Sequence, residues 1–350
     1  MTALYSDDAP GPTPFPPRVR GADRRAGPGA QPLLGTSRCH AEPLRATISN
    51  RMLNNENRSH SCYACDSMRL FRIPTAAAAL TAAIALTSCG GSEQAKAGAL
   101  GVVASFYPLA FAADEIGGAG VSVVNLTPPG VEPHDLELAP GDVKRIADAD
   151  LVLYLGGGFQ PAVEEAAQRS SRPVDLLEGL DVQAGGGPHV WLDPLRYAEL
   201  VERLGRLLDD EDAAGSLAGR LRELDGELRR GLADCDRRVF VTSHAAFGYL
   251  ADRYGLEQVS VTGIEPEAEP APADLAQVVD RVRETGATTV FVEPLASHAL
   301  AETVAREADI AVATLDPLEG LTEDQLAAGE DYFSVMRANL AALREGLGCR

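Results

Sequence analysis

Four histidines follow residue 90 in this 350-residue chain, and three of them share a setting. His134 comes shortly after an apolar run at 121–126, His189 follows a Gly-rich stretch, and His244 follows the apolar run 239–242. Such runs are typical of buried strands, and α/β folds place ligand sites at the carboxyl ends of their strands. Neutral imidazole is a common ligand of Zn²⁺ and of other divalent transition metals. The three positions therefore predict one metal site that is assembled from loops far apart in the chain.

Carboxylates at a fourth predicted strand end complete a ligand set. Asp316 directly follows the apolar run 310–315, and Glu319 lies three residues further on. Three imidazoles and one carboxylate suit Zn²⁺ in tetrahedral or slightly expanded geometry. The spacing leaves open whether Asp316 or Glu319 binds the metal. The fourth histidine, His298, precedes a predicted helix instead of following a strand, so we expect it at the surface.

Catalytic motifs are weak in this chain. Ser243 and His244 are neighbours, but no GxSxG turn accompanies them, which disfavours a serine hydrolase. Glycines 156–158 lack the spacing and the Lys-Ser/Thr pair of a phosphate-binding loop. A metal-dependent hydrolase is the remaining enzymatic alternative, and it needs an open coordination position for water, which four protein ligands would fill. We therefore expect a metal-binding protein that is not an enzyme.

Strands alternate with helices along residues 100–350, which predicts parallel βαβ units. We expect strands at 100–105, 121–126, 151–155, 239–242, 258–261, 289–292 and 310–315. We expect helices at 109–116, 140–149, 161–169, 194–208, 212–232, 245–254, 272–284, 300–307 and 331–347. The fold class is therefore α/β, with Rossmann-like lobes at 100–210 and 236–350 joined by a long rigid helix at 211–235. Loops from both lobes meet in the cleft between them, where we expect the metal site.

The first quarter of the chain differs in composition from the rest. Its first 89 residues carry a net charge of +4, whereas the remainder carries −24. Residues 1–67 are rich in Pro, Arg, Gly, Asn and Ser, so we expect disorder or a start codon assigned too early. Residues 68–88 combine a basic start, a short apolar run and small residues, which is the layout of a secretory signal peptide and places the true start at Met68.

Cys89 follows that segment in Leu-Thr-Ser-Cys, which resembles a bacterial lipobox. We expect lipidation of Cys89 after cleavage, a tether at 89–99, and a lipid-anchored protein on the extracellular face of the cell membrane. Export also makes Cys235 and Cys349 candidates for one disulfide, the alternative being two free thiols. The net charge of −20 argues against nucleic acid as a partner, because phosphate backbones attract basic surfaces.

Six segments resemble the zinc/manganese solute-binding lipoproteins of ABC transporters, and the resemblance extends over nearly all of residues 100–348. The segments are Pro133-His134-Asp135-Leu136-Glu137, Pro188-His189-Val190-Trp191-Leu192-Asp193-Pro194, Thr242-Ser243-His244-Ala245-Ala246-Phe247-Gly248-Tyr249, Val292-Glu293-Pro294, Leu315-Asp316-Pro317-Leu318-Glu319-Gly320 and Tyr332-Phe333-Ser334-Val335-Met336. The resemblance implies two α/β lobes bridged by one long helix, with a divalent metal buried between them.

The resemblance also carries the family's metal site onto matching positions of this chain. It implies that His134, His189 and His244 are ligands, and that the fourth ligand is Asp316 or Glu319, with the Leu-Glu-Gly form favouring Glu319. Manganese-type members often have Glu at the position of His244, and nitrogen ligands favour zinc over manganese. Zn²⁺ is therefore the expected cargo, with Mn²⁺ as the alternative.

The function that the resemblance implies is capture of the metal outside the cell and delivery to the permease and ATPase subunits of an ABC importer. We expect a monomer that meets the membrane through its lipid anchor. Many zinc-type members carry a long His-rich loop before the second ligand, whereas residues 179–188 contain no histidine here. An accessory zinc-collecting loop is therefore not expected. Some family members act as surface adhesins, which stands as an alternative function.

Overall fold

The structure is a computed structural model that describes residues 98–182, 187–268 and 270–350. The chain divides into two units, Met1–Leu86 and Thr87–Arg350, and the described residues all belong to the second. The expectations for the extension, the signal peptide and Cys89 lie outside the described residues and stay predictions, as does most of the tether. Among the described residues, no helix combines the length and the apolar character needed to cross a membrane.

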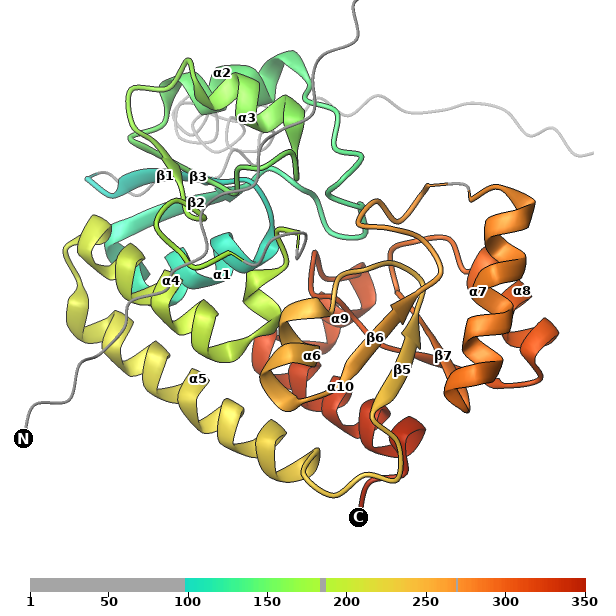
Figure 1. The fold of residues 1–350 in the computed structure, drawn as a ribbon. Helices are drawn as coiled ribbons and strands as arrows, with labels where there is room; N and C mark the ends of the chain where they lie inside the picture. Colours follow the sequence, from blue (N-terminus) through green and yellow to red (C-terminus); the bar gives the residue numbers. More distant parts are fainter. Residues whose placement is uncertain (1–97, 183–186, 269) are drawn as a thin grey trace, which may run out of the picture. The chain divides into compact units, whose positions relative to one another are not determined.

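A four-stranded parallel sheet organises the first lobe, with its strands in the order β2-β1-β3-β4. The elements are β1 (Leu100–Ala104), α1 (Tyr107–Gly117), η1 (Gly118–Gly120), β2 (Val121–Asn125), α2 (Pro140–Asp148), β3 (Leu151–Tyr154), α3 (Pro161–Ala167) and β4 (Pro173–Asp175). Figure 1 shows α2 and α3 over one face of this sheet and α1 beneath the other. Successive side chains of a strand point to opposite faces, so Val102 packs with α1 while Val103 packs under α2 and α3.

A short helical turn and two consecutive helices follow the first sheet. They are η2 (Val190–Leu192), α4 (Pro194–Leu208) and α5 (Glu211–Gly231). Asp193 begins α4 as its N-cap, because its side chain accepts hydrogen bonds from the backbone N–H groups of Leu195 and Arg196. Leucines at helical spacing bury one side of α5, namely Leu217, Leu221, Leu224 and Leu228. In Figure 1, α5 runs beside α4 and continues toward the second lobe.

The second lobe repeats the topology of the first, with the strand order β6-β5-β7-β8 and all pairs parallel. Its elements are β5 (Val239–Thr242), α6 (Gly248–Tyr254), β6 (Glu257–Ser260), α7 (Pro272–Thr285), β7 (Thr289–Val292), α8 (Ala299–Ala308), β8 (Ala311–Thr314), α9 (Glu323–Ala328) and α10 (Tyr332–Leu347). Helices α7 and α8 lie on one side of the sheet, and α6 and α10 on the other (Figure 1). The predicted two-lobed α/β fold is confirmed.

The largest hydrophobic cluster extends across both lobes. It contains Trp191 from the segment before α4, Leu224 from α5 and Phe240 from β5. Val241, the neighbour of Phe240, belongs instead to a separate cluster under α7 and α8. Because pulling the lobes apart would expose the shared cluster to water, burial of apolar surface favours a fixed arrangement of the two sheets.

The structure departs from the predicted elements in four places. Strand β4 and helix α9 were not expected, since three and six residues are too few to show a clear period. Helix α6 begins at Gly248 instead of residue 245, because Ala245 N–H donates to the carbonyl of Gly263 and the chain is still irregular there. The linking helix ends at Gly231, four residues before its expected end.

The C-terminus is tied to the segment before β5. Cys235 and Cys349 form a disulfide, and the same two residues form an isolated antiparallel bridge between their backbones. Arg237 N–H donates to the carbonyl of Leu347 at 3.0 Å. These bonds hold the end of α10 beside the second sheet.

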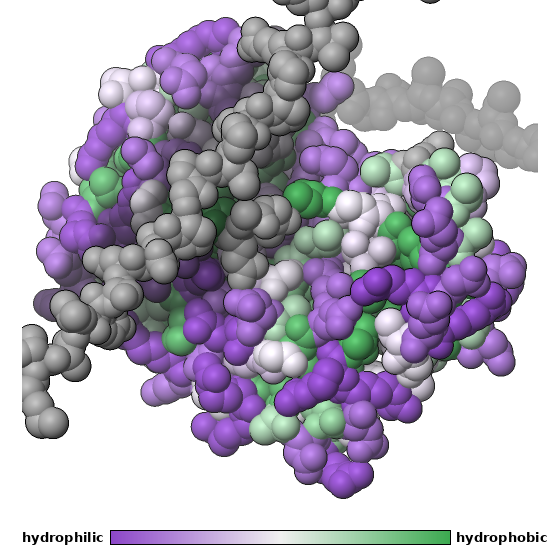
Figure 2. All heavy atoms as spheres, viewed as in Figure 1, coloured by the Kyte–Doolittle hydropathy of each residue, from purple (hydrophilic) through white to green (hydrophobic). Residues whose placement is uncertain are grey.

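Hydrophilic residues cover most of the described surface on the face drawn in Figure 2, in keeping with the acidic composition. Four large hydrophobic residues are exposed among the described ones: Val131, Val182, Val312 and Leu326. They lie on different loops and elements, so they do not mark one apolar docking surface.

Candidate metal centre

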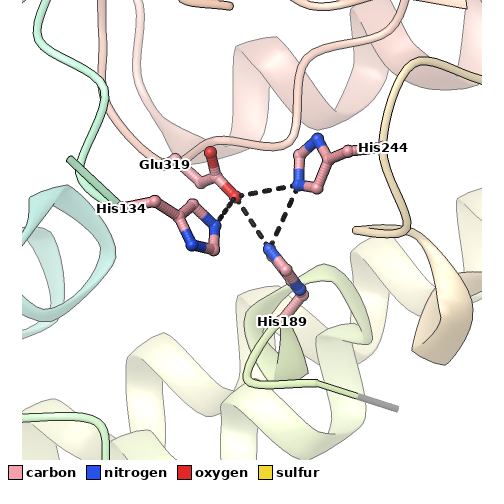
Figure 3. A group of neighbouring side chains, drawn as sticks. All are labelled: His134, His189, His244 and Glu319. Carbon is pink, nitrogen blue, oxygen red and sulfur yellow. Dashed lines mark hydrogen bonds and ion pairs between the residues drawn. The ribbon is translucent and has the colours of Figure 1, made fainter. Parts of the chain in front are cut away.

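Three histidines and one glutamate converge between the lobes. His134, His189, His244 and Glu319 each offer one ligand atom, and these atoms all lie within 4.8 Å of one another. Figure 3 shows the three rings and the carboxylate pointing toward a common centre. All four residues are buried, with exposed fractions between 0% and 8%. The structure therefore brings together residues that are separated by up to 185 positions in sequence.

The spacing of the ligand atoms matches a tetrahedral cation. Glu319 Oε1 lies 2.8 Å from His189 Nε2, 3.3 Å from His134 Nε2 and 3.4 Å from His244 Nε2. The Nε2 atoms of His189 and His244 are 3.3 Å apart. Zinc bonds to nitrogen and oxygen of about 2.0–2.1 Å give a tetrahedral edge of roughly 3.3–3.4 Å. The remaining pairs of ligand atoms lie within 4.8 Å, so a zinc ion fits the site once the most widely spaced ligand atoms move closer together.

Protons and charges in this pocket are arranged as a cation site would require. Burial alone would raise the pKa of Glu319, but contacts with the three imidazoles hold it well below its usual range. Burial also acts to lower the pKa of His244, but hydrogen bonds with Glu293 and Glu319 outweigh it and raise this pKa to about 10. Burial lowers the pKa of His189. The ionised carboxylates of Glu319 and Glu293 are thus stabilised by positive charge beside them, and a bound divalent cation would supply that charge.

His244 is held by a second buried carboxylate. It lies two residues beyond the end of β5, and Glu293 directly follows the neighbouring strand β7. Glu293 Oε2 lies 2.5 Å from His244 Nδ1, and Oε1 accepts hydrogen bonds from Ser243 Oγ and from the backbone N–H of His244. A carboxylate on the far nitrogen of a ligating histidine fixes its ring orientation and leaves Nε2 free for the metal. Glu293 had been assigned no role from sequence, although a carboxylate directly after a predicted strand was the available signal.

His189 belongs to the first half of the chain but is anchored to the second lobe. Two residues beyond it, Trp191 Nε1–H donates to the carbonyl of Pro317, and Tyr332 OH donates to the carbonyl of Trp191. The capping carboxylate of Asp193 accepts three hydrogen bonds from the guanidinium of Arg253 in α6. These bonds position the His189 backbone against the loop that carries Glu319.

His134 lies in the long loop between β2 and α2. The carbonyl of Pro133 accepts a hydrogen bond from Gln160 Nε2, and the ring of Phe159 packs edge-on against His134 with centroids 4.7 Å apart. Glu132 accepts from the backbone N–H of His134, and burial together with the charge of Glu319 raises the pKa of Glu132 to about 9. Glu265, from the loop after β6, approaches His134 Nδ1 to 3.5 Å.

Of the two predicted carboxylates after β8, the structure places Glu319 at the centre and Asp316 beside it. Asp316 accepts hydrogen bonds from the backbone N–H of Leu318 at 2.7 Å and from Gln325 Nε2 at 2.8 Å. Leu318 has a φ of 55°, which is rare for a leucine and turns the chain so that Glu319 faces the histidines. Asp316 therefore stabilises the turn that presents Glu319.

His298 is separate from this group. It is half-buried at the start of α8, and Nε2 lies 2.6 Å from the backbone carbonyl of Glu293. His298 is not among the four clustered residues, as expected. It was predicted to lie at the surface, whereas the structure shows it half-buried.

Two parallel-sheet lobes with convergent ligands from both define a two-lobed binding protein. Residues 102–346 match the sequence model of a family described as zinc-uptake complex component A, periplasmic (ZnuA). The chain belongs to this family.

Known relatives agree with this assignment. The zinc-binding protein AdcA of Streptococcus pyogenes serotype M1 is 36% identical over 288 residues, which cover 71% of this chain and 56% of AdcA. The chain thus spans little more than half of that relative. The high-affinity zinc uptake system protein ZnuA of Bacillus subtilis is 31% identical over 299 residues, covering 77% of this chain and 94% of that protein.

A solved structure with the same fold is the Zn(II)-bound ZnuA-like domain of Streptococcus pneumoniae AdcA. It aligns with a TM-score of 0.63 and 35% identity, covering 71% of this chain and 99% of that domain. The aligned part of the chain therefore corresponds to a complete domain of that protein.

Proposed function

We propose that this protein captures Zn²⁺ outside the cell and delivers it to the permease and ATPase subunits of an ABC importer. The observation that carries the proposal is the buried group of three imidazoles and one carboxylate, whose donor atoms are spaced for a tetrahedral cation. The names of the relatives, which describe zinc binding and zinc uptake, support the same cargo.

The ligands in this proposal are His134, His189, His244 and Glu319. Three nitrogen donors favour Zn²⁺ over Mn²⁺, which prefers carboxylate, carbonyl and water oxygens. Asp316 acts on the site indirectly, because both of its carboxylate oxygens already accept hydrogen bonds, one from Leu318 in the loop and one from Gln325 in α9.

The closed coordination shell supports transport over hydrolysis. Hydrolytic metal sites keep an open position for water, whereas four protein ligands complete a tetrahedral site. Adhesion at a host surface is the weaker alternative. It is supported by the family resemblance and by similarity to the laminin-binding protein of Streptococcus agalactiae, described as an adhesin with metal transporting activity (29% identity, TM-score 0.64). Anchoring through lipidated Cys89, exposure on the extracellular face of the membrane and a monomeric state complete the proposal.

Metal analysis of protein purified without added metal, combined with zinc titration, tests the proposal. We expect one zinc per chain and no hydrolytic turnover. The variant His189→Ala removes one of four ligands. Structural zinc sites have apparent binding free energies of about 10–16 kcal/mol, so one of four ligands contributes roughly 3 kcal/mol. Its loss should therefore raise Kd by about 100-fold. His298→Ala is the matched control and should bind as the wild type does. Equal affinities of wild type and His189→Ala would contradict the proposal.

A further inference from the structure

The proposed zinc site is closed to solvent, so a metal ion needs a path through the protein. Its four ligand residues are at most 8% exposed, and His189 and His244 are fully buried. The hydrophobic cluster that crosses both lobes opposes their separation. The path must therefore start at a cavity that borders the ligands.

One cavity lies directly beside the site, on the side of His134 and His189. It has a volume of about 310 Å³ and is lined by residues of both lobes, among them Gly156, Gly157, Phe159, Pro188, Ile264 and Glu265. Phe159 packs against the His134 ring, and Pro188 immediately precedes His189. A Cβ on Gly157 or on Gly158, which also lines the cavity, would meet no atom within 4 Å, so no side chain fills that part of the cavity wall.

Glu265 connects this cavity with the buried ligands. Its side chain is 63% exposed, yet its Oε2 lies 3.5 Å from Nδ1 of His134, whose side chain is only 1% exposed. Carboxylate oxygen is an accepted zinc ligand, and an exposed carboxylate at a cavity wall attracts cations. Glu265 therefore reaches from solvent to the Nδ1 edge of His134, the histidine whose Nε2 faces Glu319 on the other side of the ring.

A second cavity reaches the residues that hold His244. It is lined by Ser243, Thr262 and Glu267 among others, and Ser243 Oγ donates to the Glu293 carboxylate. Glu293 is 1% exposed and also accepts from the His244 backbone N–H, whereas the Glu265 side chain at the first cavity is 63% exposed. An ion arriving at the second cavity would meet a buried carboxylate that is already engaged by hydrogen bonds, so the first cavity is the more open path.

We propose that zinc enters and leaves through the cavity at Phe159 and Pro188, and that the Glu265 carboxylate is the first protein ligand it meets. From Glu265 the ion passes to His134 and then to the full set of four. This inference rests on the proposed function, since it concerns the same cargo and the same site.

Stopped-flow measurement of zinc binding at low ionic strength tests the role of Glu265. Glu265→Gln should lower the association rate constant by up to about 10-fold, the lower limit of the range for electrostatic steering by a charged cleft, and this effect should shrink as salt is added. The dissociation rate constant should fall by a similar factor, because the same group assists exit, so that Kd changes less than about twofold. Glu267→Gln is the matched control on the same loop, since it removes an equal charge at the other cavity.

A second variant tests the cavity itself without changing charge. Val182 lines the cavity, is 39% exposed and is separate from the four ligands. Val182→Trp should slow both binding and release while leaving Kd unchanged, which also shows that the variant is folded.

The outcomes separate the two proposals. If Glu265→Gln raises Kd through faster dissociation alone, Glu265 only positions His134 and the entry role is wrong. If Glu267→Gln lowers the association rate constant as much as Glu265→Gln does, general surface charge explains both effects and the proposed path is wrong. Unaltered rate constants in both Glu265→Gln and Val182→Trp would also overturn the path. Absence of stoichiometric zinc binding by the wild type would instead overturn the proposed function.

Discussion

The two lobes share one strand order, yet they hold their histidines in very different ways. In the second lobe, His244 lies two residues beyond the end of β5, and its far nitrogen is 2.5 Å from Glu293, which is 1% exposed. In the first lobe, His134 lies in an irregular loop, and the carboxylate nearest its far nitrogen is the largely exposed Glu265 at 3.5 Å. The comparison indicates a site with one fixed half and one adaptable half.

The fixed half includes more than the second lobe. His189 comes from the first half of the chain, but Trp191 and Asp193 bond it to Pro317 and Arg253 of the second lobe. Three of the four proposed ligands are therefore held in one framework. His134 alone depends on the loop between β2 and α2, and it is also the ligand beside the proposed entry cavity. Metal exchange can then proceed at His134 while the other ligands keep their positions.

Substitution of the two carboxylates after β8 should give the largest difference in zinc affinity, because Glu319 is a proposed ligand and Asp316 only stabilises the turn that presents it. Glu319→Gln should raise the zinc Kd by about 100-fold, because it removes the charge that three imidazoles face and one of four ligands. Asp316→Asn should leave Kd within about tenfold but lower the melting temperature, because it weakens the bonds to Leu318 and Gln325. Competition titration with a chelator and thermal denaturation measure the two effects. A larger loss of affinity in Asp316→Asn would reverse the assignment.

Acidification should weaken zinc binding through the same imidazoles. The pKa of His244 is raised to about 10 in the metal-free protein, so at pH 7.5 this ring carries a proton that zinc must displace. Affinity then falls about tenfold for each pH unit per proton released, and more steeply where ordinary histidines titrate near 6.5. We expect Kd to rise by about 100-fold or more between pH 7.5 and pH 5.

Calorimetry in buffers of different ionisation enthalpy should show release of about one proton per zinc near pH 8. A Kd that stays constant between pH 7.5 and pH 5 would be incompatible with three histidine ligands.

The fixed half of the site predicts a positioning role for Glu293. Glu293→Gln removes the carboxylate that orients His244, and loss of such a partner typically weakens metal binding by about 10- to 100-fold. It should also lower the pKa of His244, so proton release on zinc binding near pH 8 should decrease. A merely structural effect would leave proton release unchanged. Glu265→Gln, in the adaptable half, should change Kd less than twofold, and equal losses in the two variants would remove the distinction.

The disulfide should have the smallest effect on binding. Replacing Cys235 and Cys349 together by serine should lower the free energy of unfolding by about 2–5 kcal/mol, because their link closes 114 residues of chain. Zinc affinity should stay within about twofold, since the ligand residues lie at the opposite, carboxyl ends of the strands. Denaturant titration and zinc titration of the double variant check the two expectations. A large loss of affinity would show that the end of α10 controls the site.

The structure brings together His134, His189 and His244, which sequence reasoning had selected because each follows a recognisable apolar strand or Gly-rich turn, and parallel strands end at one edge. The spacing left Asp316 and Glu319 open, and only the family resemblance favoured Glu319, since the choice depends on the left-handed backbone of Leu318. A leucine gives no sign of such a conformation in sequence.

Contacts between lobes were also beyond the sequence. Glu293 was noted only as part of a motif, because its approach to His244 arises from the pairing of β5 with β7. The bonds of Trp191 and Arg253 across the lobes join residues far apart in the chain, and no local pattern marks them. Local periodicity gave the elements and their order, whereas the tertiary arrangement determines which carboxylate faces which ring.

Anomalous diffraction at the zinc edge, from crystals of the protein loaded with one equivalent of zinc, would locate the metal and its ligands. We expect a single peak within about 2.0–2.2 Å of Nε2 of His134, His189 and His244 and of one carboxylate oxygen of Glu319. A peak bound by other residues, or a metal coordinated by Asp316 with Glu319 turned away, would contradict this expectation.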